Sequence, residues 1–525
     1  MGRRLPLLAV LILTAHAQER RVADRYAVVN LNSLPYSVLP PDSTNSTPRP
    51  SRTSEPRLKR AGGSPNLLPG HATAAGPAAF TGFAGLLDNY GSTPPDTGGA
   101  VGPHDVFTML NTQLAVQSRG GAMRPHFPMD LAQFWSGLGQ FQKIFDPRIL
   151  YDAPADRWIA AAAADPGSST AAVLLAVSQS GDPAGNWTQV LIAVGKSGTW
   201  ADYPVLGQNK TWITVSANLL GLPPRGAYAR TELYVFNKAD LYEKGKTGYA
   251  VFSDTHGQFT PAIDFDRLSD TMYFAQETAD AAGGRFRVSV LRGPAESESF
   301  TPGTSTIDAG VAWGETSNTD SDFAPQLGSY FKVDTGDSRL QNCVLRNGSI
   351  WCAQTIFLPA AKPTRAAVQW FQLDPAAARL VQIGRVDDAT ATRFYAYPTI
   401  AVNKSNDVVV GYSRFTATDY PSAAFSFRLA GDAAHGLRAP EIFKAGEAAY
   451  VGRGADEGSN RWGDVSATVV DPVDDQAFWT IQEFAAVPTE HFLGRWGTWW
   501  ANILMPCCSP VPSSVGGLRT TVAGP

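Results

Sequence analysis

The sequence N-R-W-G-D-V-S-A-T-V-V-D-P-V-D-D-Q-A-F-W, residues 460–479, contains the pattern that decides the fold. An alternating run at 465–470 is followed by a turn rich in Asp and Pro at 471–475, and a second apolar run begins at Phe478. Alternation of apolar and polar residues indicates a half-buried strand, and Pro with Asp marks a place where the chain reverses. The stretch therefore predicts two antiparallel strands joined by a polar turn.

The same pattern recurs along the chain. Close copies are F-D-P-R-I-L-Y-D-A-P-A-D-R-W at 145–158 and Y-P-T-I-A-V-N-K-S-N-D-V-V-V-G-Y at 397–412, and looser copies lie at 96–116, 202–215 and 261–274. A hairpin that repeats at this spacing is typical of a repeat fold.

Seven units can be placed with this repeat, at 94–120, 146–192, 202–240, 260–293, 326–373, 396–430 and 459–503. They predict an all-β protein consisting of a single seven-bladed β-propeller, with one blade per unit. Six or eight blades are alternatives, because the first unit is weak and residues 294–325 are unassigned. One short helix is expected at 129–141.

Composition and charge exclude one class of partner. The 525 residues are 44% hydrophobic and 17% charged, and the formal net charge of -4 is spread along the chain without a basic block. Binding to nucleic acid needs clustered Lys and Arg to neutralise phosphates, so no nucleic-acid partner is expected. The 13 Trp and 26 Phe suit sheets with aromatic packing.

The first 17 residues predict export. They contain Arg3 and Arg4, an apolar run at 5–14, and the small-x-small sequence Ala15-His16-Ala17, which together indicate a secretory signal peptide cleaved after Ala17. The run is shorter than the roughly 20 residues that span a bilayer, and no later run reaches that length. We therefore expect a secreted protein, extracellular or periplasmic, with no transmembrane segment, and we expect it to be a monomer.

The rest of the chain divides by composition. Residues 18–79 are rich in Pro, Ser and Thr and have too few apolar residues for a core, which predicts a disordered leader or propeptide. The propeller is expected at 80–505, and a tail without a defined role at 506–525.

The sequence C-V-L-R-N-G-S-I-W-C at 343–352 predicts a hairpin with a disulfide. Asn-Gly is a strong signal for a two-residue turn, and counting back from it places Cys343 opposite Cys352 in a non-hydrogen-bonded pair, where the Cα atoms are closest. A cross-strand disulfide fits there, and export permits it. The adjacent Cys507 and Cys508 could pair with each other, bridge to another chain, or stay free.

A set of motifs carries a resemblance to a known family. They are P-P-D-T-G-G-A-V-G-P (94–103), D-P-R-I-L-Y-D-x-x-x-D-R-W (146–158), V-S-Q-S-G-D-P-A-G-N-W (177–187), D-Y-P (202–204), Y-P-T-I-A-V-N (397–403), Y-P-S-A (420–423), R-W-G-D-V-S-A-T-V-V-D-P-V-D-D (461–475) and W-G-T-W (496–499). They resemble a large family of secreted, mostly bacterial proteins described as β-propeller-like and of uncharacterised function. The resemblance covers most of 80–503 and implies fold and export, but no activity.

A weaker similarity is to glycoside hydrolase propellers. In these a blade often opens with Asp-Pro, and a strand ends in Ser followed by a turn like Pro-x-Gly-x-Trp. Asp146-Pro147 and S-G-D-P-A-G-N-W at 180–187 resemble that pattern.

The repeat predicts a functional site at one opening of the propeller. Residues at corresponding positions of the blades converge at one rim of the channel, and the repeat places five carboxylates there: Asp96, Asp146, Asp202, Asp264 and Asp464. Mutual repulsion would raise some of their pKa values. Such a ring could supply the two carboxyls, about 5 to 9.5 Å apart, that glycosidic cleavage requires, or oxygen ligands for Ca²⁺.

Roles follow from this geometry. Asp146, Asp202 and Asp464 are the candidates for acid, base and orienting group. The candidates for substrate binding are Asp96 and Asp264 together with aromatic residues that could stack on sugars, namely Trp158, Tyr203, Tyr397 and Trp462, with Trp212 nearby. The alternative is that each Asp fixes a corner of its blade by accepting hydrogen bonds from backbone amides, and that the aromatic residues pack between sheets.

The turn with Asp471, Asp474 and Asp475 could hold Ca²⁺, with a solvated hairpin tip as the alternative. No cofactor is required. The sequence thus favours a secreted propeller that acts on an extracellular polysaccharide or glycoconjugate, as a glycoside hydrolase if it is an enzyme. The alternatives are a non-catalytic propeller that binds glycan or protein, and a surface protein stabilised by Ca²⁺.

Overall fold

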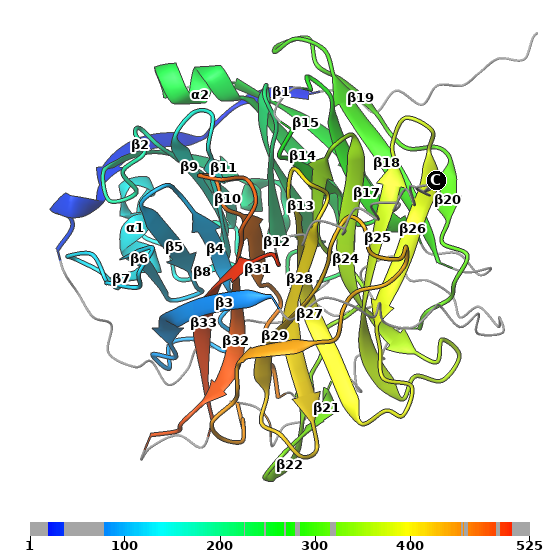
Figure 1. Ribbon diagram of the computed structural model, residues 1–525. Helices are drawn as coiled ribbons and strands as arrows, with labels where there is room; N and C mark the ends of the chain where they lie inside the picture. The colour runs from blue at the N-terminus through cyan, green and yellow to red at the C-terminus, as the bar shows by residue number, and fades with distance from the viewer. Residues whose placement is uncertain are drawn as a thin grey trace, which may run out of the picture.

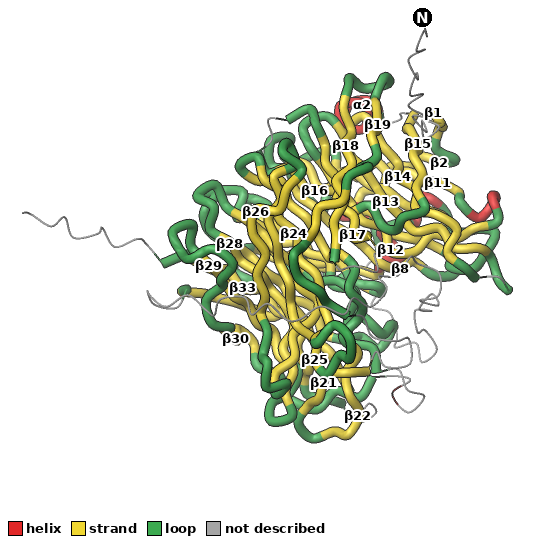
Figure 2. The backbone as a smooth tube through the Cα atoms, turned by 90° about the vertical axis from the view of Figure 1, so that its right-hand side faces the viewer, coloured by secondary structure: helices red, strands yellow, loops and turns green. Residues whose placement is uncertain are grey.

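The computed structural model describes residues 19–35, 78–224, 226–245, 248–266, 269–278, 284–314, 322–452, 455, 460–489 and 494–506. These residues form 33 strands and only two short α-helices, so the protein is nearly all-β, as expected (Figures 1 and 2). The predicted signal peptide, most of the predicted leader, and Cys507 and Cys508 lie outside the described residues. In the part of the chain that is described, no helix is long and apolar enough to cross a membrane.

The strands form antiparallel groups that follow one another along the chain. The first three groups are β4 (Gly98–Val101), β5 (Asp105–Met109), β6 (Gln113–Ser118) and β7 (Met129–Asp130); β8 (Ile144–Asp152), β9 (Arg157–Ala164), β10 (Ala172–Ser178) and β11 (Asn186–Ala193); and β12 (Thr199–Gln208), β13 (Trp212–Gly221), β14 (Tyr228–Asn237) and β15 (Gly248–Asp254).

The next two groups are β16 (Thr260–Asp264), β17 (Met272–Thr278), β18 (Arg285–Arg292), β19 (Ser299–Thr301) and β20 (Thr306–Asp308); and β23 (Leu340–Arg346), β24 (Ser349–Leu358), β25 (Arg365–Asp374) and β26 (Arg379–Val386). The last two are β27 (Arg393–Val402), β28 (Val408–Thr416), β29 (Ser422–Arg428) and β30 (Glu441–Lys444); and β31 (Ala467–Val470), β32 (Phe478–Ala486), β33 (Arg495–Leu504) and β3 (Ala79–Leu87). A separate hairpin consists of β21 (Asp322–Gln326) and β22 (Ser329–Asp334).

The first strands of these groups surround a common centre. Each contacts the first strand of the next group, and the circuit runs β4, β8, β12, β16, β23, β27, β31 and back to β4. Between β16 and β23 the contact is a short parallel ladder, Ala262↔Cys343 to Asp264↔Leu345, which joins two groups into one nine-stranded sheet. Residues far apart in sequence therefore meet where these strands begin.

The repeated Asp-Pro and Tyr-Pro dipeptides mark a bulge in the first strand. The pairing register shifts between Phe145 and Arg148, between Asp202 and Val205, and between Ala396 and Thr399. Within these shifts Asp146, Tyr203 and Tyr397 have φ of 52°, 50° and 56°, and each precedes a Pro. Pro has no N–H for a ladder and is tolerated at bulges, so the sequence repeat is explained by the backbone conformation.

Residues 19–35 are more ordered than predicted. β1 (Glu19–Val22) pairs with β15, and β2 (Arg25–Asn30) pairs with β11, so two strands extend the outer edges of two neighbouring groups. Buried Val29 and Leu31 pack in the core beneath them. The expectation of disorder is therefore wrong for 19–35. An edge strand is ordered by its backbone hydrogen bonds to the sheet, even when its own sequence has few apolar residues.

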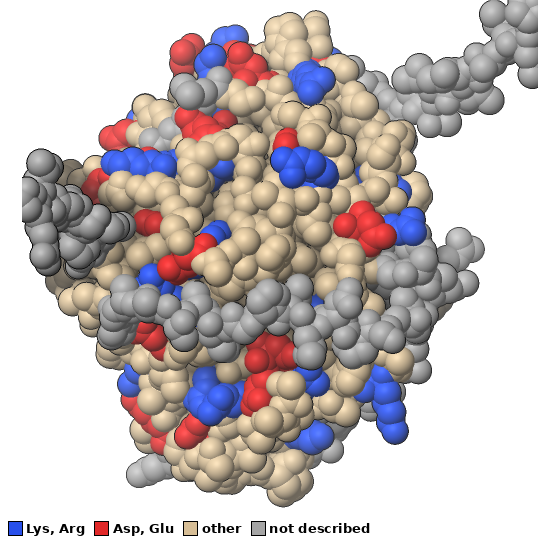
Figure 3. All heavy atoms as spheres, turned by 45° about the vertical axis from the view of Figure 1, so that its right-hand side comes forward, with Lys and Arg blue, Asp and Glu red and all other residues tan. Residues whose placement is uncertain are grey.

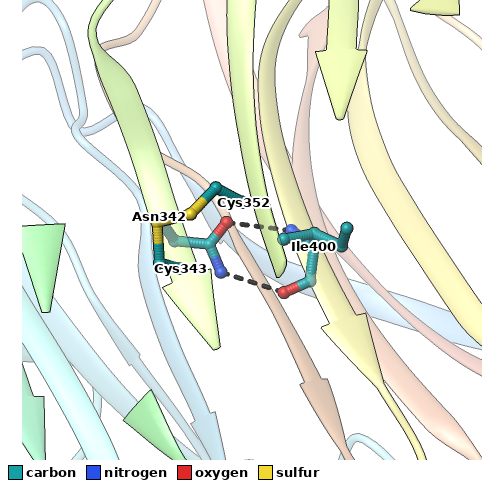
Figure 4. The surroundings of a disulfide bond; sticks show 4 residues. All are labelled: Asn342, Cys343, Cys352 and Ile400. Carbon is teal, nitrogen blue, oxygen red and sulfur yellow. Dashed lines mark hydrogen bonds between the residues drawn. A yellow bond between two sulfur atoms is a disulfide. The ribbon is translucent and has the colours of Figure 1, made fainter. Parts of the chain in front are cut away.

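The hairpin at 340–358 has the predicted register. Arg346 faces Ser349, Leu345 faces Ile350, and Cys343 faces Cys352. The two cysteines form a disulfide with a Cα–Cα distance of 4.2 Å (Figure 4). Next to it the amide of Asn342 donates to the oxygen of Ile400 and accepts from its N–H, both at 2.9 Å, and so joins β23 to β27.

Two other boundaries differ from the prediction. The unit expected at 326–373 begins at Leu340, because 322–334 folds as the separate hairpin β21–β22. The helix expected at 129–141 is reduced to α1 (Leu131–Phe134) and a 3-10 turn, Ser136–Leu138, which ends at Gly139 with φ 118°. The helix α2 (Lys238–Lys244) has no counterpart in the prediction; Asn237 accepts from the N–H of Ala239 at its start, and Gly245 ends it with φ 64°.

Candidate functional site

A carboxyl cluster lies where the first strands begin. It is built around Asp96 and Asp146, which are fully and almost fully buried, with φ of 53° and 52°. Asn111, from the turn between β5 and β6, holds both. Its Nδ2 donates to Asp96 Oδ2 at 2.6 Å and to the oxygen of Pro94 at 2.9 Å, and its Oδ1 accepts from the Asp146 N–H at 2.8 Å.

The pKa values of Asp96 and Asp146 are both raised. Burial raises the pKa of Asp146 to about 6, and the charges of Asp202 and Asp464 add to the effect, while a hydrogen bond from Asp96 opposes it. Burial, followed by the charges of Asp464 and Asp146, holds the pKa of Asp96 well above its usual range. Both carboxyls are therefore held toward the protonated form, Asp96 more strongly than Asp146.

Asp464 is the most accessible member of the cluster, with its side chain 24% exposed, and it is ion-paired to the guanidinium of Arg461. Burial lowers the pKa of Arg461, but Asp464, Asp96 and Asp334 outweigh burial and raise it above the ordinary value. Arg461 is thus a permanent cation beside the acids. Burial lowers the pKa of Lys143 to about 8, although Asp146 and Asp96 oppose the shift.

The cluster contains a carboxyl that the sequence analysis did not single out. Glu483 of β32 is buried and accepts a hydrogen bond from Thr97 Oγ1 at 2.8 Å, while its Oε2 has no hydrogen-bond partner among the described residues. Burial raises its pKa well above the usual range; the bond from Thr97 opposes this, and the charges of Asp96 and Asp464 add to it. The only signal in sequence is a charged residue inside a strand that otherwise has no charged residue.

Tyr203 forms one wall of the cluster. Its N–H donates to Asp146 Oδ2 at 3.0 Å, and its ring lies between two guanidiniums, 4.7 Å from Arg148 and 4.3 Å from Arg339. Its hydroxyl donates to Gln341 Oε1 at 3.1 Å, and burial raises its pKa to about 12. Two guanidiniums lie over the ring, which is only 4% exposed, so Tyr203 positions Asp146 and leaves no face for a sugar.

The structure brings together four of the five predicted aspartates: Asp96, Asp146, Asp202 and Asp464. Asp264 lies apart, at the last position of β16 and opposite Leu345. In β16 the position that corresponds to Tyr203-Pro204 is occupied by Thr260-Pro261. Asp264 lies four residues after Thr260, which corresponds to about 13 Å along the strand.

The other predicted stacking residues are buried between sheets. Trp158 donates from Nε1 to the oxygen of Gly181 and packs against Phe107, and Trp462 donates to Ser413 Oγ. Tyr397 donates its hydroxyl to the oxygen of Asp334. Trp212 is also buried. Their contacts are those of the alternative reading, in which the aromatic residues hold neighbouring sheets together.

The three aspartates of the predicted calcium turn have separate contacts. Asp471 is ion-paired with Arg119 and accepts from Trp479 Nε1, Asp474 Oδ1 accepts from two backbone amides of its own turn, and Asp475 is paired with Arg346. Among the described residues no group of three or more His, Cys, Asp or Glu could hold a metal ion. Calcium binding stays a prediction.

A small cavity occupies the centre of the ring of first strands. Its volume is about 70 Å³, and every first strand contributes to its lining, with Gly98, Arg148, Val205, Pro261, Gln341, Thr399 and Val465 among the residues. A water molecule takes up about 30 Å³ of liquid, so the cavity has room for about two waters and none for a sugar ring. A glycan would therefore have to lie above the cluster, over Asp464.

Comparisons with known proteins identify no relative in sequence. No protein-family model matches the chain, and no curated protein matches it. Solved structures similar to it include the Dos1 propeller, at 10% identity over 75% of each chain and TM-score 0.34. Phage phi92 endosialidase is 8% identical over 85% of this chain and 71% of its own, with TM-score 0.37. A polysaccharide lyase of family PL25, an ulvan lyase, is 8% identical over 77% of this chain and 94% of its own, with TM-score 0.40.

These TM-scores lie below 0.5, so the similarities assign no residue and no activity to this chain. The family suggested by the sequence motifs stays a prediction.

Proposed function

We propose that the protein is a secreted, seven-bladed β-propeller that acts on an extracellular glycan at the carboxyl cluster. The blade number is supported by seven groups of strands whose first strands contact one another in a closed circuit. Export is supported by the disulfide between Cys343 and Cys352, since disulfides persist in oxidising compartments.

One observation carries the chemistry. Two neighbouring carboxyl groups are held in different environments, Asp146 with its pKa raised to about 6 and Asp464 in an ion pair with Arg461. Glycosidic cleavage needs one carboxylic acid to protonate the leaving oxygen and a second, charged carboxylate. Asp146 is the proposed acid, Asp464 the proposed carboxylate, and Asp202 the group whose charge helps Asp146 to keep its proton.

The test is hydrolysis of a panel of polysaccharides by the purified protein and by two variants, Asp146→Asn and Asp464→Asn. Asn tolerates positive φ as Asp does, so Asp146→Asn should fold. Loss of a general acid should lower kcat/KM by at least about 100-fold. The matched control is Asp165→Asn, another buried aspartate with φ 52°, whose oxygens accept from the Gln142 N–H and the Thr170 hydroxyl. Full turnover in both cluster variants would exclude the proposal.

A second candidate function, binding of a glycan without cleavage, is favoured by a different observation. Asp96, Asp146 and Asp202 are at most 6% exposed, and the central cavity admits only water. In this case Asp464→Asn would weaken glycan binding, and no reducing ends would appear with any polysaccharide of the panel.

A further inference from the structure

A second cavity lies at the opposite ends of the first strands. Its volume is about 560 Å³. Its walls are the chain after β16 (Phe265 and Asp266), the turn between β23 and β24 (Arg346–Gly348), Tyr273 of β17, and Asp475 from the turn after β31. Phe265 lies five residues after Thr260, where β16 begins, which corresponds to about 17 Å of extended chain. A small ligand in this cavity is therefore separate from one over the carboxyl cluster.

Side-chain hydrogen bonds join the segments that line the cavity. Asp266 accepts from the N–H of Asn347 at 2.7 Å and from the N–H of Gly348 at 3.0 Å. Buried Arg346 donates to the oxygen of Phe265 at 3.0 Å and to Asp475 Oδ2 at 2.5 Å. The groups are thus arranged before any ligand arrives, which lowers the entropy lost on binding.

The turn of a third group supports these walls. Asn347 Nδ2 donates to Asn406 Oδ1 at 2.8 Å and to the oxygen of Lys404 at 3.3 Å, and Lys404 Nζ donates to the oxygen of Asp474 at 2.8 Å. The turns that carry Arg346, Lys404 and Asp475 therefore form one connected rim, and the cavity does not depend on a single loop.

The lining indicates the chemistry of the ligand. The volume falls in the range of about 300 to 1,000 Å³ that is usual for small-molecule sites. Phe265 and Tyr273 are partly exposed and line the cavity with aromatic rings, while Asp475 and Asn347 line it with planar polar groups. Two carboxylates, Asp266 and Asp475, face one guanidinium that is already paired, so an anionic ligand would be repelled.

A pyranose has an apolar C–H face that stacks on aromatic rings, and adjacent hydroxyls that pair with planar polar groups. We infer that this cavity binds a neutral saccharide unit. It is an anchoring site about one strand length from the carboxyl cluster, and it requires no catalysis there.

The test is calorimetric titration of the full-length secreted protein with neutral gluco-, xylo- and galacto-oligosaccharides in the presence of a chelator, with an oligomer of uronic acids as the charged comparison. The variant Tyr273→Ala should weaken binding of the neutral ligand about tenfold, the loss expected for one stacking ring. Tyr273→Phe keeps the ring and should bind like the native protein. Asp475→Asn keeps an acceptor for Arg346 and should weaken binding severalfold.

The variant Asp146→Asn separates the two sites, because it should abolish cleavage at the carboxyl cluster and leave this affinity unchanged. The inference is overturned if no neutral oligosaccharide binds, if only the uronic oligomer binds, or if Tyr273→Ala and Asp475→Asn bind as the native protein does.

Discussion

At the scale of single residues, the carboxyl cluster is a set of acids that the fold keeps partly neutral. Asp96 and Asp146 are both buried and both bonded to Asn111, and two like charges in such a place cannot both be retained at low cost. Asn111 is hydrogen-bonded to both, and Arg461 supplies a buried cation in contact with Asp464. Protonation is therefore a property that these contacts control.

This arrangement predicts how stability depends on pH. The pKa of Asp146 is about 6 in the folded protein, against 3.8 for the unperturbed group. The folded chain therefore binds more protons than the unfolded chain, and the contribution of Asp146 is fully present below pH 4 and is lost as the pH rises through 6. Two pKa units correspond to about 3 kcal/mol.

The variant Asp146→Asn has no titrating group at this position, so its stability does not fall in this way as the pH rises. Its free energy of unfolding relative to the native protein should rise by up to about 3 kcal/mol between pH 4 and pH 7, measured by urea denaturation. A difference that is flat or falls with pH would mean that folding does not raise the pKa of Asp146.

Part of this site could be predicted from sequence, and the reason is the repeat. Asp96 and Asp146 occupy the same position of the first strand, next to Pro or Thr, so their convergence follows from the pattern. The prediction for Asp264 is wrong, because in its unit Thr260-Pro261 occupies the position that corresponds to Asp146-Pro147. Glu483 lies on a second strand, where no repeat position marks it, and its burial beneath Gly463 is a product of packing between groups.

At the scale of elements, local signals were reliable where the turn fixed the register. The Asn347-Gly348 turn has φ of 48° and 72° and set every pair back to Cys343. By contrast, the start of the fifth group could not be predicted from sequence. The hairpin β21–β22 has the same alternation of apolar and polar residues as the strands of the group. Its tip exposes Leu327 and Tyr330, which pattern alone does not distinguish from core.

The disulfide on this hairpin gives a prediction at the same scale. Cys343 and Cys352 are nine positions apart, and closing so short a loop in the unfolded chain is worth about 2 to 3 kcal/mol. The double variant Cys343→Ala/Cys352→Ala should lose that amount in chemical denaturation under non-reducing conditions. It should keep the native register, since the turn and the Asn342–Ile400 hydrogen bonds remain.

The change in stability should disappear when native and variant proteins are compared in a strong reductant. A double variant that is as stable as the native protein without reductant would show that the cross-link adds nothing to a hairpin already fixed by its turn.

At the scale of the whole molecule, acidic and basic side chains are interspersed on the face shown in Figure 3, in agreement with the small net charge of -4. The arrangement of the groups depends on closure of the circuit of first strands. No local sequence pattern predicts that closure. The last group is completed by β3, whose pairing with β33 runs from Ala79↔Leu504 to Leu87↔Gly497 and ties residues near 80 to residues near 500. β1 and β2 only extend outer edges.

Two truncations should separate these roles. A chain starting at Ala78 lacks β1 and β2 and loses the buried side chains of Val29 and Leu31, but it keeps the closing strand. It should fold with a lowered Tm, because burial of each such side chain contributes about 1.5 to 3 kcal/mol. A chain starting at Asn89 also lacks β3, so β33 becomes an open edge. That chain should aggregate or unfold without a cooperative transition in calorimetry, whereas a sharp transition near the native Tm would show that the circuit holds without its closing strand.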